Sequence, residues 1–357
     1  MLSGMYLDPL HSFEITAELL GLIAEIEEFK GRWQALKNLA PDRLTALKRI
    51  ATIESVGSST RIEGAKLSDE EVDLLLAGLD IRSFRTRDEQ EVAGYAKAME
   101  LAFESWSEIT LTENHIKQLH GVLLSFSGKD ERHRGEYKKV PNHVEAFDPE
   151  GRSLGVVFET ATPFDTPRVM MELVEWLNQT LAARRYHPLL VIGVFIVRFL
   201  AIHPFQDGNG RLARVVTTLL LLRAGYAYVP YCSLERVIED NKDEYYRTLR
   251  RAQSTLDKGE AQLGDWIVYF LRCLVKQKDV LDRKLERERA MEVLSPLDEE
   301  LVRLIREHGR ITLAAAERIT GANRNTLKVH LRQLVEHGRL ILLGRGRGSW
   351  YEPGNRR

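Results

Sequence analysis

The chain has 357 residues, with 51 lysines and arginines against 52 aspartates and glutamates, and 44% of its residues are hydrophobic. This composition excludes collagen-like, fibrous and wholly disordered proteins, and the length predicts two or three domains. The net charge of −1 indicates no partner, but residues 297–357 hold 12 Lys and Arg against 7 Asp and Glu. Residues 297–357 therefore form a small basic module of net charge +5, and the rest of the chain is mildly acidic.

Cysteine usage and the N-terminus predict the compartment. Cys232 and Cys273 form no CxxC pair, so we expect neither a disulfide framework nor a zinc site. The N-terminus lacks the basic start and continuous apolar core of a signal peptide, and no apolar stretch approaches the ~20 residues that span a bilayer. We therefore expect a cytoplasmic protein that does not span a membrane.

Helical periodicity dominates the first half of the chain. Apolar residues recur every three or four positions over residues 14–106, which predicts helices there. Further amphipathic helices are predicted over residues 111–127 and 166–182. The residues able to cap these two helices are Thr110 or Thr112, and Thr166.

Residues 137–158 differ, because β-branched and aromatic residues surround Asp148-Pro149-Glu150-Gly151, a turn signal. They predict a short hairpin. Residues 187–201 are apolar on nearly every side, which is typical of a helix buried in a bundle. The apolar stripe over residues 211–224 predicts a second helix. The predicted fold is thus mainly α, with a small β-hairpin.

The segment between these two helices reads HPFQDGNGRLAR, from His203 to Arg214. Gly208 to Gly210 tolerate left-handed backbone angles, so their amides can form an anion-binding concavity at the start of a helix. Arg211 and Arg214 are three residues apart and can reach phosphate oxygens from neighbouring faces of the first turn.

Two further residues of this segment indicate chemistry. Asp207 adds a carboxylate beside the phosphate concavity, and Mg²⁺ bridging the two would remove their repulsion. His203 titrates near neutral pH and is a candidate general base. The combination predicts phosphoryl or nucleotidyl transfer in preference to a polar turn that merely breaks a helix.

Every specified position of the segment matches the HPFx(D/E)GNGRxxR signature, so the chain resembles the Fic family over about residues 110–250. The resemblance implies a helical core that transfers AMP from ATP to a Ser, Thr or Tyr hydroxyl of a target protein, or of itself, and releases pyrophosphate. It implies that His203 deprotonates the hydroxyl and that Asp207 holds Mg²⁺. The nucleotide-binding residues it implies are Gly208, Asn209, Gly210, Arg211, Leu212, Ala213 and Arg214.

Two other segments resemble the family. Residues 238–246 resemble its IxxNRxxYY stretch, in which the asparagine lies by the nucleoside; because Lys242 replaces the usual arginine, the resemblance is carried over to Asn241 alone. The hairpin near Val140–Phe158 resembles the flap that pairs its main chain with an extended target segment. A plain surface hairpin remains the alternative.

Ser59 to Gly64 resembles the (S/T)xxxE(G/N) inhibitory helix of the family, in its N-terminal arrangement. The resemblance implies a salt bridge from Glu63 to Arg214 that leaves bound ATP misaligned. A contact worth ~1.5–3 kcal/mol would lower the competent population by roughly 10- to 150-fold. An ordinary surface residue is the alternative for Glu63. In some relatives the same carboxylate helps water to remove AMP, so reverse de-AMPylation stays open.

Residues 297–351 predict a helix, a short strand, two helices and two strands around Gly344–Gly348. This order is similar to a winged helix-turn-helix module, with Arg324, Asn325 and Lys328 on the would-be recognition helix. DNA binding and a protein-interaction or dimerisation role are both consistent with a net charge of this size.

The predicted domains are an N-terminal helical region (1–109), a Fic catalytic core (110–250), a helical linker (251–296) and a winged helix-turn-helix module (297–357). The favoured function is an autoinhibited, Mg²⁺-dependent protein adenylyltransferase, for which the resemblance suggests a homodimer. The competing hypothesis is a DNA-binding transcriptional regulator whose core only senses nucleotide. His203 argues against it, because a sensor needs no base beside the phosphates.

Overall fold

The computed structural model describes residues 9–11, 13–35, 41–78, 84, 86–108, 110–147, 153–256, 262–292, 295–336, 338–344 and 346–354. Contacts divide the chain into two units, residues 1–281 and 282–357. The helices that begin in the first unit are α1 (Ala17–Ala35), α2 (Pro41–Ile62), α3 (Asp69–Ala77), α4 (Arg87–Ser105), α5 (Glu113–Leu123), α6 (Thr166–Ala183), α7 (Pro188–Ile202), α8 (Asn209–Arg223), α9 (Leu234–Glu239), α10 (Lys242–Gln253) and α11 (Gly264–Glu292), with a 3-10 turn at Val229–Tyr231.

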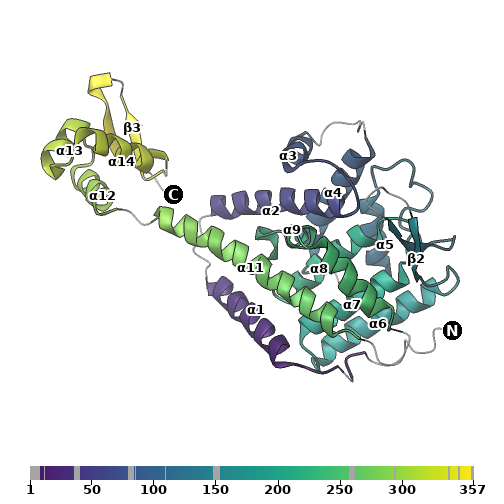
Figure 1. The fold of residues 1–357 in the computed structure, drawn as a ribbon. Coiled ribbons are helices and arrows are strands. Elements are labelled where there is room, and N and C mark those ends of the chain that lie inside the picture. The colour runs from purple at the N-terminus through teal and green to yellow at the C-terminus, as the bar shows by residue number, and fades with distance from the viewer. Residues whose placement is uncertain are drawn as a thin grey trace. The chain divides into compact units, whose positions relative to one another are not determined.

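The core of the first unit surrounds α7, in which every residue from Leu189 to Ile202 is buried. The predicted buried helix is therefore confirmed. Helices α6, α8 and α10 pack against α7 (Figure 1). Such all-round burial explains why α7 is apolar on nearly all sides, whereas a surface helix shows an apolar stripe.

Residues 251–296, predicted as a helical linker, contribute α11, and α11 up to Leu281 belongs to the first unit. The indole Nε1 of Trp266 donates to the carbonyl of Gly193 in α7 (2.8 Å). Ile267 and Leu271 are also buried. This half of α11 therefore packs into the core.

The two predicted threonine caps have different outcomes. Thr112 caps α5, because its hydroxyl accepts from the amide of His115 (3.2 Å). The prediction for Thr166 is wrong. Asp165 is the N-cap of α6, and the Thr166 hydroxyl donates to the carbonyl of Thr162 (2.7 Å). The chain already turns one residue earlier, so the hydroxyl bonds four residues back.

The predicted hairpin is present as an antiparallel pair, β1 (His143–Phe147) and β2 (Ser153–Glu159). Its register shifts twice, between Val144 and Glu145 and between Ala146 and Phe147. Such irregularities twist a two-stranded ribbon. The predicted turn at Asp148–Gly151 lies outside the described residues.

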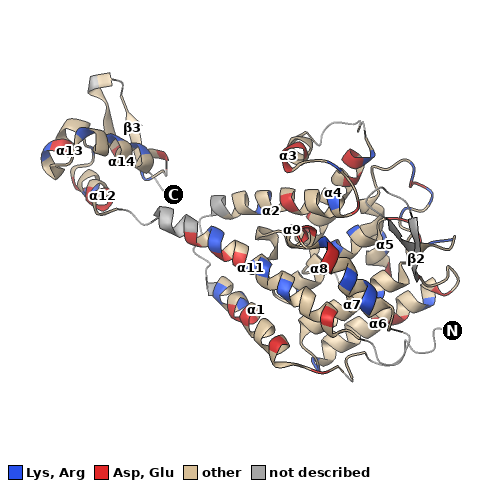
Figure 2. Cartoon of the chain, viewed as in Figure 1, with Lys and Arg blue, Asp and Glu red and all other residues tan. Residues whose placement is uncertain are grey.

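In the second unit, α12 (Pro296–His308), α13 (Leu313–Thr320) and α14 (Arg324–Glu336) precede the antiparallel strands β3 (Leu340–Leu343) and β4 (Trp350–Pro353). A bridge joins Ile311 to Tyr351. These elements follow the predicted order, and the winged-helix assignment stays a prediction. Basic residues lie along α13 and α14 (Figure 2). The unit has a core of its own, formed by Leu301, Leu304, Ile305, Ile311, Ala316, Leu327, Leu331, Leu334 and Leu340.

Two simpler predictions concern cysteines and membranes. Cys232 and Cys273 are both buried, with no disulfide between them. Among the described residues, no helix combines the length and the apolar content that a membrane crossing needs.

Candidate active site

His203 ends α7 in a left-handed conformation, with φ of 51° and ψ of 59°. Its amide donates to the carbonyl of Phe199 (2.9 Å), and its imidazole Nδ1 lies 3.4 Å from the carbonyl of Leu200. Burial, reinforced by the cation of Lys138, lowers the pKa of His203 to about 4. The imidazole is therefore neutral at pH 7 and able to accept a proton.

Asn209 closes the loop that follows. Its side-chain oxygen accepts from the amide of Phe205 (2.9 Å), and its side-chain nitrogen donates to the Phe205 carbonyl (2.7 Å). Gly208 precedes it as the N-cap of α8 with φ of 78°, a conformation that favours glycine. The predicted loop-to-helix junction is thus present.

The first turn of α8 supplies backbone donors. Helix geometry leaves the amides of Asn209, Gly210 and Arg211 without partners inside the helix. The amide of Leu212 already donates to the carbonyl of Gly208 (2.8 Å). The phosphate-binding role predicted for Leu212 and Ala213 stays a prediction.

Asp207 lies beside this helix start and is surrounded by donors. One carboxylate oxygen accepts from the Gly208 amide (2.6 Å) and from Arg211 (3.2 Å), and the other accepts from Arg87 (2.8 Å). Burial opposes ionisation, but Arg211, the Gly208 amide and Arg87 outweigh it and hold the pKa of Asp207 below its usual range. The carboxylate is ionised at neutral pH, as a Mg²⁺ ligand must be.

Arg211 and Arg214 are both buried and point to different partners. Arg211 Nη1 lies 3.1 Å from the carboxylate of Glu91. Arg214 donates to the hydroxyl of Ser59 (2.8 Å), to the Ser59 carbonyl (2.9 Å) and to the carboxylate of Glu63 (2.8 Å). Among the described residues, Arg211 Nε and Arg214 Nη1 are buried without a hydrogen-bond partner. Buried cationic donors of this kind suit an anionic ligand.

Glu63 follows the last turn of α2 and lies over the start of α8. A Cβ atom at position 210 would collide with its carboxylate, so glycine at this position permits the close approach. Arg61 anchors the end of α2, because it pairs with Glu239 (2.6 Å) and with Asp69 (3.0 Å). The structure therefore brings the two predicted partners, Glu63 and Arg214, together.

Asn241 is the N-cap of α10. Its side-chain nitrogen donates to the carbonyl of Val237 (2.7 Å), and its side-chain oxygen accepts from Lys276 (3.1 Å). One turn later in α10, Tyr245 interacts with Arg214. Asn241 therefore belongs to the helix that borders the site, and its predicted contact with the nucleoside stays a prediction.

Sequence reasoning did not find Arg87 and Glu91, which α4 presents to the site. Arg87 pairs with Glu91 (2.7 Å) and Asp207, while Glu91 faces Arg211. The four side chains form a ring of alternating charge. The only sequence signal is the spacing of Arg87 and Glu91, four apart on a helix, which is common on solvated helix faces.

His120 is a third residue that the sequence did not single out. Its ring stacks on Phe205, with centroids 3.8 Å apart. Its Nδ1 accepts from the Gly135 amide (3.0 Å), which leaves Nε2 as the donor to the Asp207 carbonyl (3.0 Å). Burial lowers the pKa of His120 to about 4, so the neutral ring holds the Asp207 backbone.

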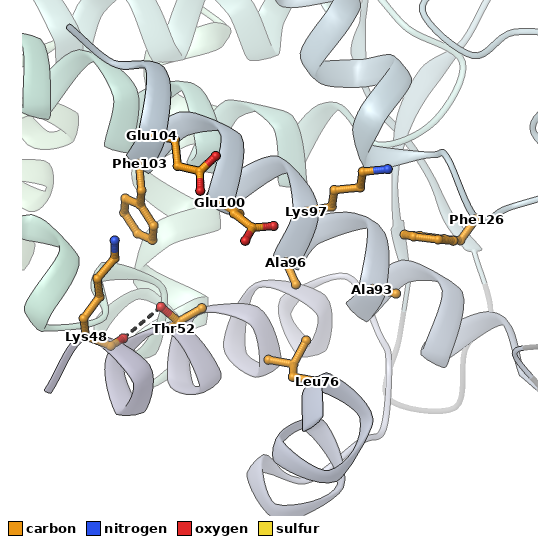
Figure 3. A pocket seen from close by; sticks show the side chains of 10 residues that line it. All are labelled: Lys48, Thr52, Leu76, Ala93, Ala96, Lys97, Glu100, Phe103, Glu104 and Phe126. Atoms are coloured by element: carbon orange, nitrogen blue, oxygen red, sulfur yellow. Dashed lines mark hydrogen bonds between the residues drawn. The ribbon is translucent and has the colours of Figure 1, made fainter. Parts of the chain in front are cut away.

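A pocket of about 440 Å³ lies elsewhere in the first unit, between α2, α3 and α4 (Figure 3). Leu76, Phe103 and Phe126 contribute apolar surface to it, and its lining includes no residue from 203–214. It is therefore separate from the candidate active site.

Known proteins resemble this chain in sequence and in fold. Residues 110–221 match the sequence model of the Fic/DOC family, and residues 285–349 match that of a bacterial protein of unknown function, DUF977. The chain is 25% identical over 239 residues to a protein named protein adenylyltransferase Fic from Drosophila grimshawi, covering 66% of this chain and 44% of that protein. The chain thus spans less than half the length of the curated relatives that it matches.

Solved structures are similar over larger shares of the chain. A Fic family protein from Desulfovibrio desulfuricans G20 superposes with a TM-score of 0.65 and 24% identity, over 99% of both chains. A Fic-domain-containing signalling protein from Bacteroides thetaiotaomicron VPI-5482 superposes with a TM-score of 0.58 and 25% identity, over 71% of this chain and 93% of the other. With its helical Fic fold and the match at residues 110–221, this chain carries a Fic domain of the Fic/DOC family.

Proposed function

We propose that the chain is an autoinhibited protein adenylyltransferase, which transfers AMP from ATP to a Ser, Thr or Tyr hydroxyl of a target protein. One observation carries the proposal. A neutral imidazole, an ionised carboxylate and two buried arginines, each with an N–H group that has no hydrogen-bond partner among the described residues, gather within the twelve residues from His203 to Arg214. The relatives named protein adenylyltransferase support the same reaction class.

In the proposed reaction, the target oxygen forms a bond to the α-phosphorus of ATP. The bond from that phosphorus to the bridging oxygen breaks, and pyrophosphate leaves with the electron pair. The hydroxyl proton passes to His203, whose neutral ring can accept it. Arg211 and Arg214 balance the charge of the phosphates.

Asp207 is the residue that would hold Mg²⁺. The donor set fits this ion, because Mg²⁺ in nucleotide sites takes one or two carboxylates and completes its shell with phosphates and water. When bound, Mg²⁺ would neutralise charge on the phosphates. Among the described residues, no group of three or more His, Cys, Asp or Glu side chains gathers to hold a metal.

Glu63 supplies the proposed restraint. Its carboxylate holds Arg214 and covers the first turn of α8 at Gly210. An arginine engaged in this way is not available to orient the terminal phosphate, so ATP would bind in a geometry unsuited to attack.

The test compares wild type, Glu63→Gly and Glu63→Gly/His203→Ala. Each protein is incubated with Mg²⁺ and ATP labelled on the α-phosphate, and in parallel with ATP labelled on the γ-phosphate. We expect Glu63→Gly to incorporate the α-label and to gain the mass of AMP, and the double variant to incorporate none while keeping its melting temperature. Transfer of the γ-label would contradict AMP transfer. Label loss on incubation of the modified protein with wild type and Mg²⁺ measures the reverse reaction.

A second function is proposed for the C-terminal unit, namely DNA binding through α14. Arg324, Asn325 and Lys328 are all exposed on the first turns of this helix, while Leu327 and Leu331 face the core. Exposed basic and amide side chains on one helix face are suited to phosphate and base-edge contacts.

A further inference from the structure

The loop that carries His203 is bonded to a lysine at the base of the hairpin. The ammonium of Lys138 donates to the carbonyl of Ile202 (3.0 Å). The backbone amide of Lys138 donates to the carbonyl of Pro204 (2.9 Å). Lys138 therefore holds the backbone on both sides of His203.

The same lysine is bonded to both ends of the hairpin. Its ammonium also donates to the side-chain oxygen of Asn142 and to the hydroxyl of Thr160, each at 2.8 Å. Asn142 directly precedes β1, and Thr160 directly follows β2. All three N–H donors of the ammonium are thus used, one on the His203 loop and two on the hairpin ends.

Asn142 completes the connection. Its side-chain nitrogen donates to the carbonyl of Phe205 (2.8 Å) and lies 3.4 Å from that of His203. The Thr160 hydroxyl lies 2.7 Å from the Asn142 carbonyl. We call Lys138, Asn142 and Thr160 the lysine clamp. It contacts the carbonyls of four consecutive residues, 202 to 205.

The clamp contains a buried charge that a purely structural contact would not need. Lys138 is 2% exposed. Among the described residues it pairs with no carboxylate, and its ammonium bonds only neutral oxygens. Burial lowers the pKa of Lys138 to about 8, so the charge is retained at neutral pH against a desolvation penalty. His203 in turn holds a left-handed conformation that L-residues avoid.

We propose that Lys138 is a positioning residue that couples the hairpin to His203. The inference rests on the proposed AMP transfer, with the target segment docked along the hairpin backbone. One ammonium bonds both the hairpin ends and the His203 loop. A hydroxyl of a segment docked on the hairpin is therefore kept at a fixed position relative to the His203 imidazole. The charged side chains proposed to hold Mg²⁺ and the phosphates, namely Asp207, Arg211 and Arg214, have other partners. Lys138 therefore acts on the attack step and not on ATP binding.

The experiment uses the full chain with Glu63→Gly as the parent. Lys138→Met, Lys138→Arg and Thr160→Val are compared with Lys139→Met, which removes the neighbouring, exposed lysine. The rate of self-modification is measured at saturating ATP, together with the ATP concentration that gives half of this rate. We expect Lys138→Met to lower the saturating rate about 10- to 100-fold, the loss typical of a misplaced reacting group. The ATP concentration that gives half of the saturating rate should stay unchanged, and Lys138→Arg should restore part of the rate.

A second measurement does not depend on activity. The pKa of His203 is followed by NMR in the parent and in each variant. The charged groups that act on this imidazole are Lys138, which lowers its pKa, and Glu63 and Asp207, which raise it. With Glu63 replaced in every protein, Lys138→Met should raise the pKa of His203, and Lys139→Met should leave it unchanged.

The outcomes separate this inference from the proposed function. If the parent transfers AMP and Lys138→Met keeps the parent rate, Lys138 does not position the attack. The same conclusion follows if the ATP concentration for half of the saturating rate rises by the factor by which that rate falls. If Lys138→Met does not fold, Thr160→Val decides the question, because it removes one hydroxyl and should still lower the rate alone. If the parent binds ATP but transfers nothing, the proposed function fails; an unchanged His203 pKa in Lys138→Met then overturns the clamp as well.

Discussion

Glu63 and Arg214 are 151 residues apart in the chain, yet the carboxylate accepts a charge-assisted hydrogen bond from the guanidinium at 2.8 Å. Arg214 is buried and also bonds Ser59, so two residues at the end of α2 hold it. A side chain fixed in this way needs free energy to turn toward a phosphate. The size of that free energy sets the strength of the proposed inhibition.

The first prediction concerns this residue. Glu63→Gly should raise the rate of AMP transfer by roughly 10- to 150-fold, as expected from the loss of a contact worth ~1.5–3 kcal/mol. Glu63→Gln keeps the shape but loses the charge, so its rate should fall between wild type and Glu63→Gly. Initial rates with α-labelled ATP measure both. Equal rates for all three proteins would contradict an inhibitory role.

A second prediction at the residue scale follows from His120. Its pKa is about 4 in the folded chain, against an ordinary value near 6.5. Between these pH values the unfolded chain binds a proton that the folded chain does not. The free energy of unfolding should therefore fall as pH drops from about 6.5 to 4, with a contribution from His120 of up to about 3 kcal/mol.

This pH dependence is measured by denaturation of wild type and His120→Gln at pH 7, 5 and 4. Carboxylates titrate in both proteins, so the difference between the two isolates the histidine. The stability advantage of wild type should shrink as pH falls. A constant difference over this range would show that His120 does not titrate as expected.

At the scale of elements, α4 and α8 meet through the ring formed by Arg87, Glu91, Asp207 and Arg211. Arg87 is about half exposed and donates to the Asp207 oxygen at 2.8 Å. A cation that binds this carboxylate must compete with Arg87. The contact between the two helices thus influences the proposed Mg²⁺ site.

The third prediction follows from this competition. Arg87→Gln, in the Glu63→Gly background, should lower the Mg²⁺ concentration for half-maximal transfer by about two- to five-fold, the equivalent of an exposed ion pair of ~0.5–1 kcal/mol. Arg49→Gln removes another exposed ion pair, with Asp73. This control should leave the Mg²⁺ concentration for half-maximal transfer unchanged. Calorimetric titration with Mg²⁺ and ATP provides a readout without turnover. A higher Mg²⁺ requirement would instead assign Arg87 to phosphate binding.

At the scale of the whole molecule, the chain joins a Fic domain to a unit with its own core and an excess of basic residues. The fourth prediction is that the full chain binds duplex DNA of mixed sequence, with a Kd on the order of 10⁻⁴–10⁻⁶ M that weakens steeply with salt. Lys328→Ala should weaken binding and reduce the salt dependence, because phosphate contacts release counterions.

The control for DNA binding is Arg303→Ala on α12, which removes an exposed arginine from a different helix. Binding that is insensitive to both substitutions would contradict the assignment to α14.

Light scattering of the same samples tests the homodimer that the family resemblance suggests, and a monomeric mass would overturn it.

Local sequence patterns determined the main helices, the hairpin and the chemistry of one segment of this protein. The nearly all-apolar run of α7, the apolar stripe of α8 and the hairpin were predictable, because the periods of helices and strands repeat within a few residues of the chain. The segment from His203 to Arg214 was predictable for the same reason, since its glycines, carboxylate and arginines act within one loop and one helical turn.

Tertiary structure decided which distant side chains complete the site. Arg87 meets Asp207 across 120 residues and Lys138 meets Ile202 across 64, and such contacts leave no periodic trace in the sequence. The first half of α11 packs on α7 because its apolar side chains are buried there, and its periodicity could not indicate this partner. Local patterns specify the elements and the chemistry of one segment, while the packing of those elements determines which charges surround it.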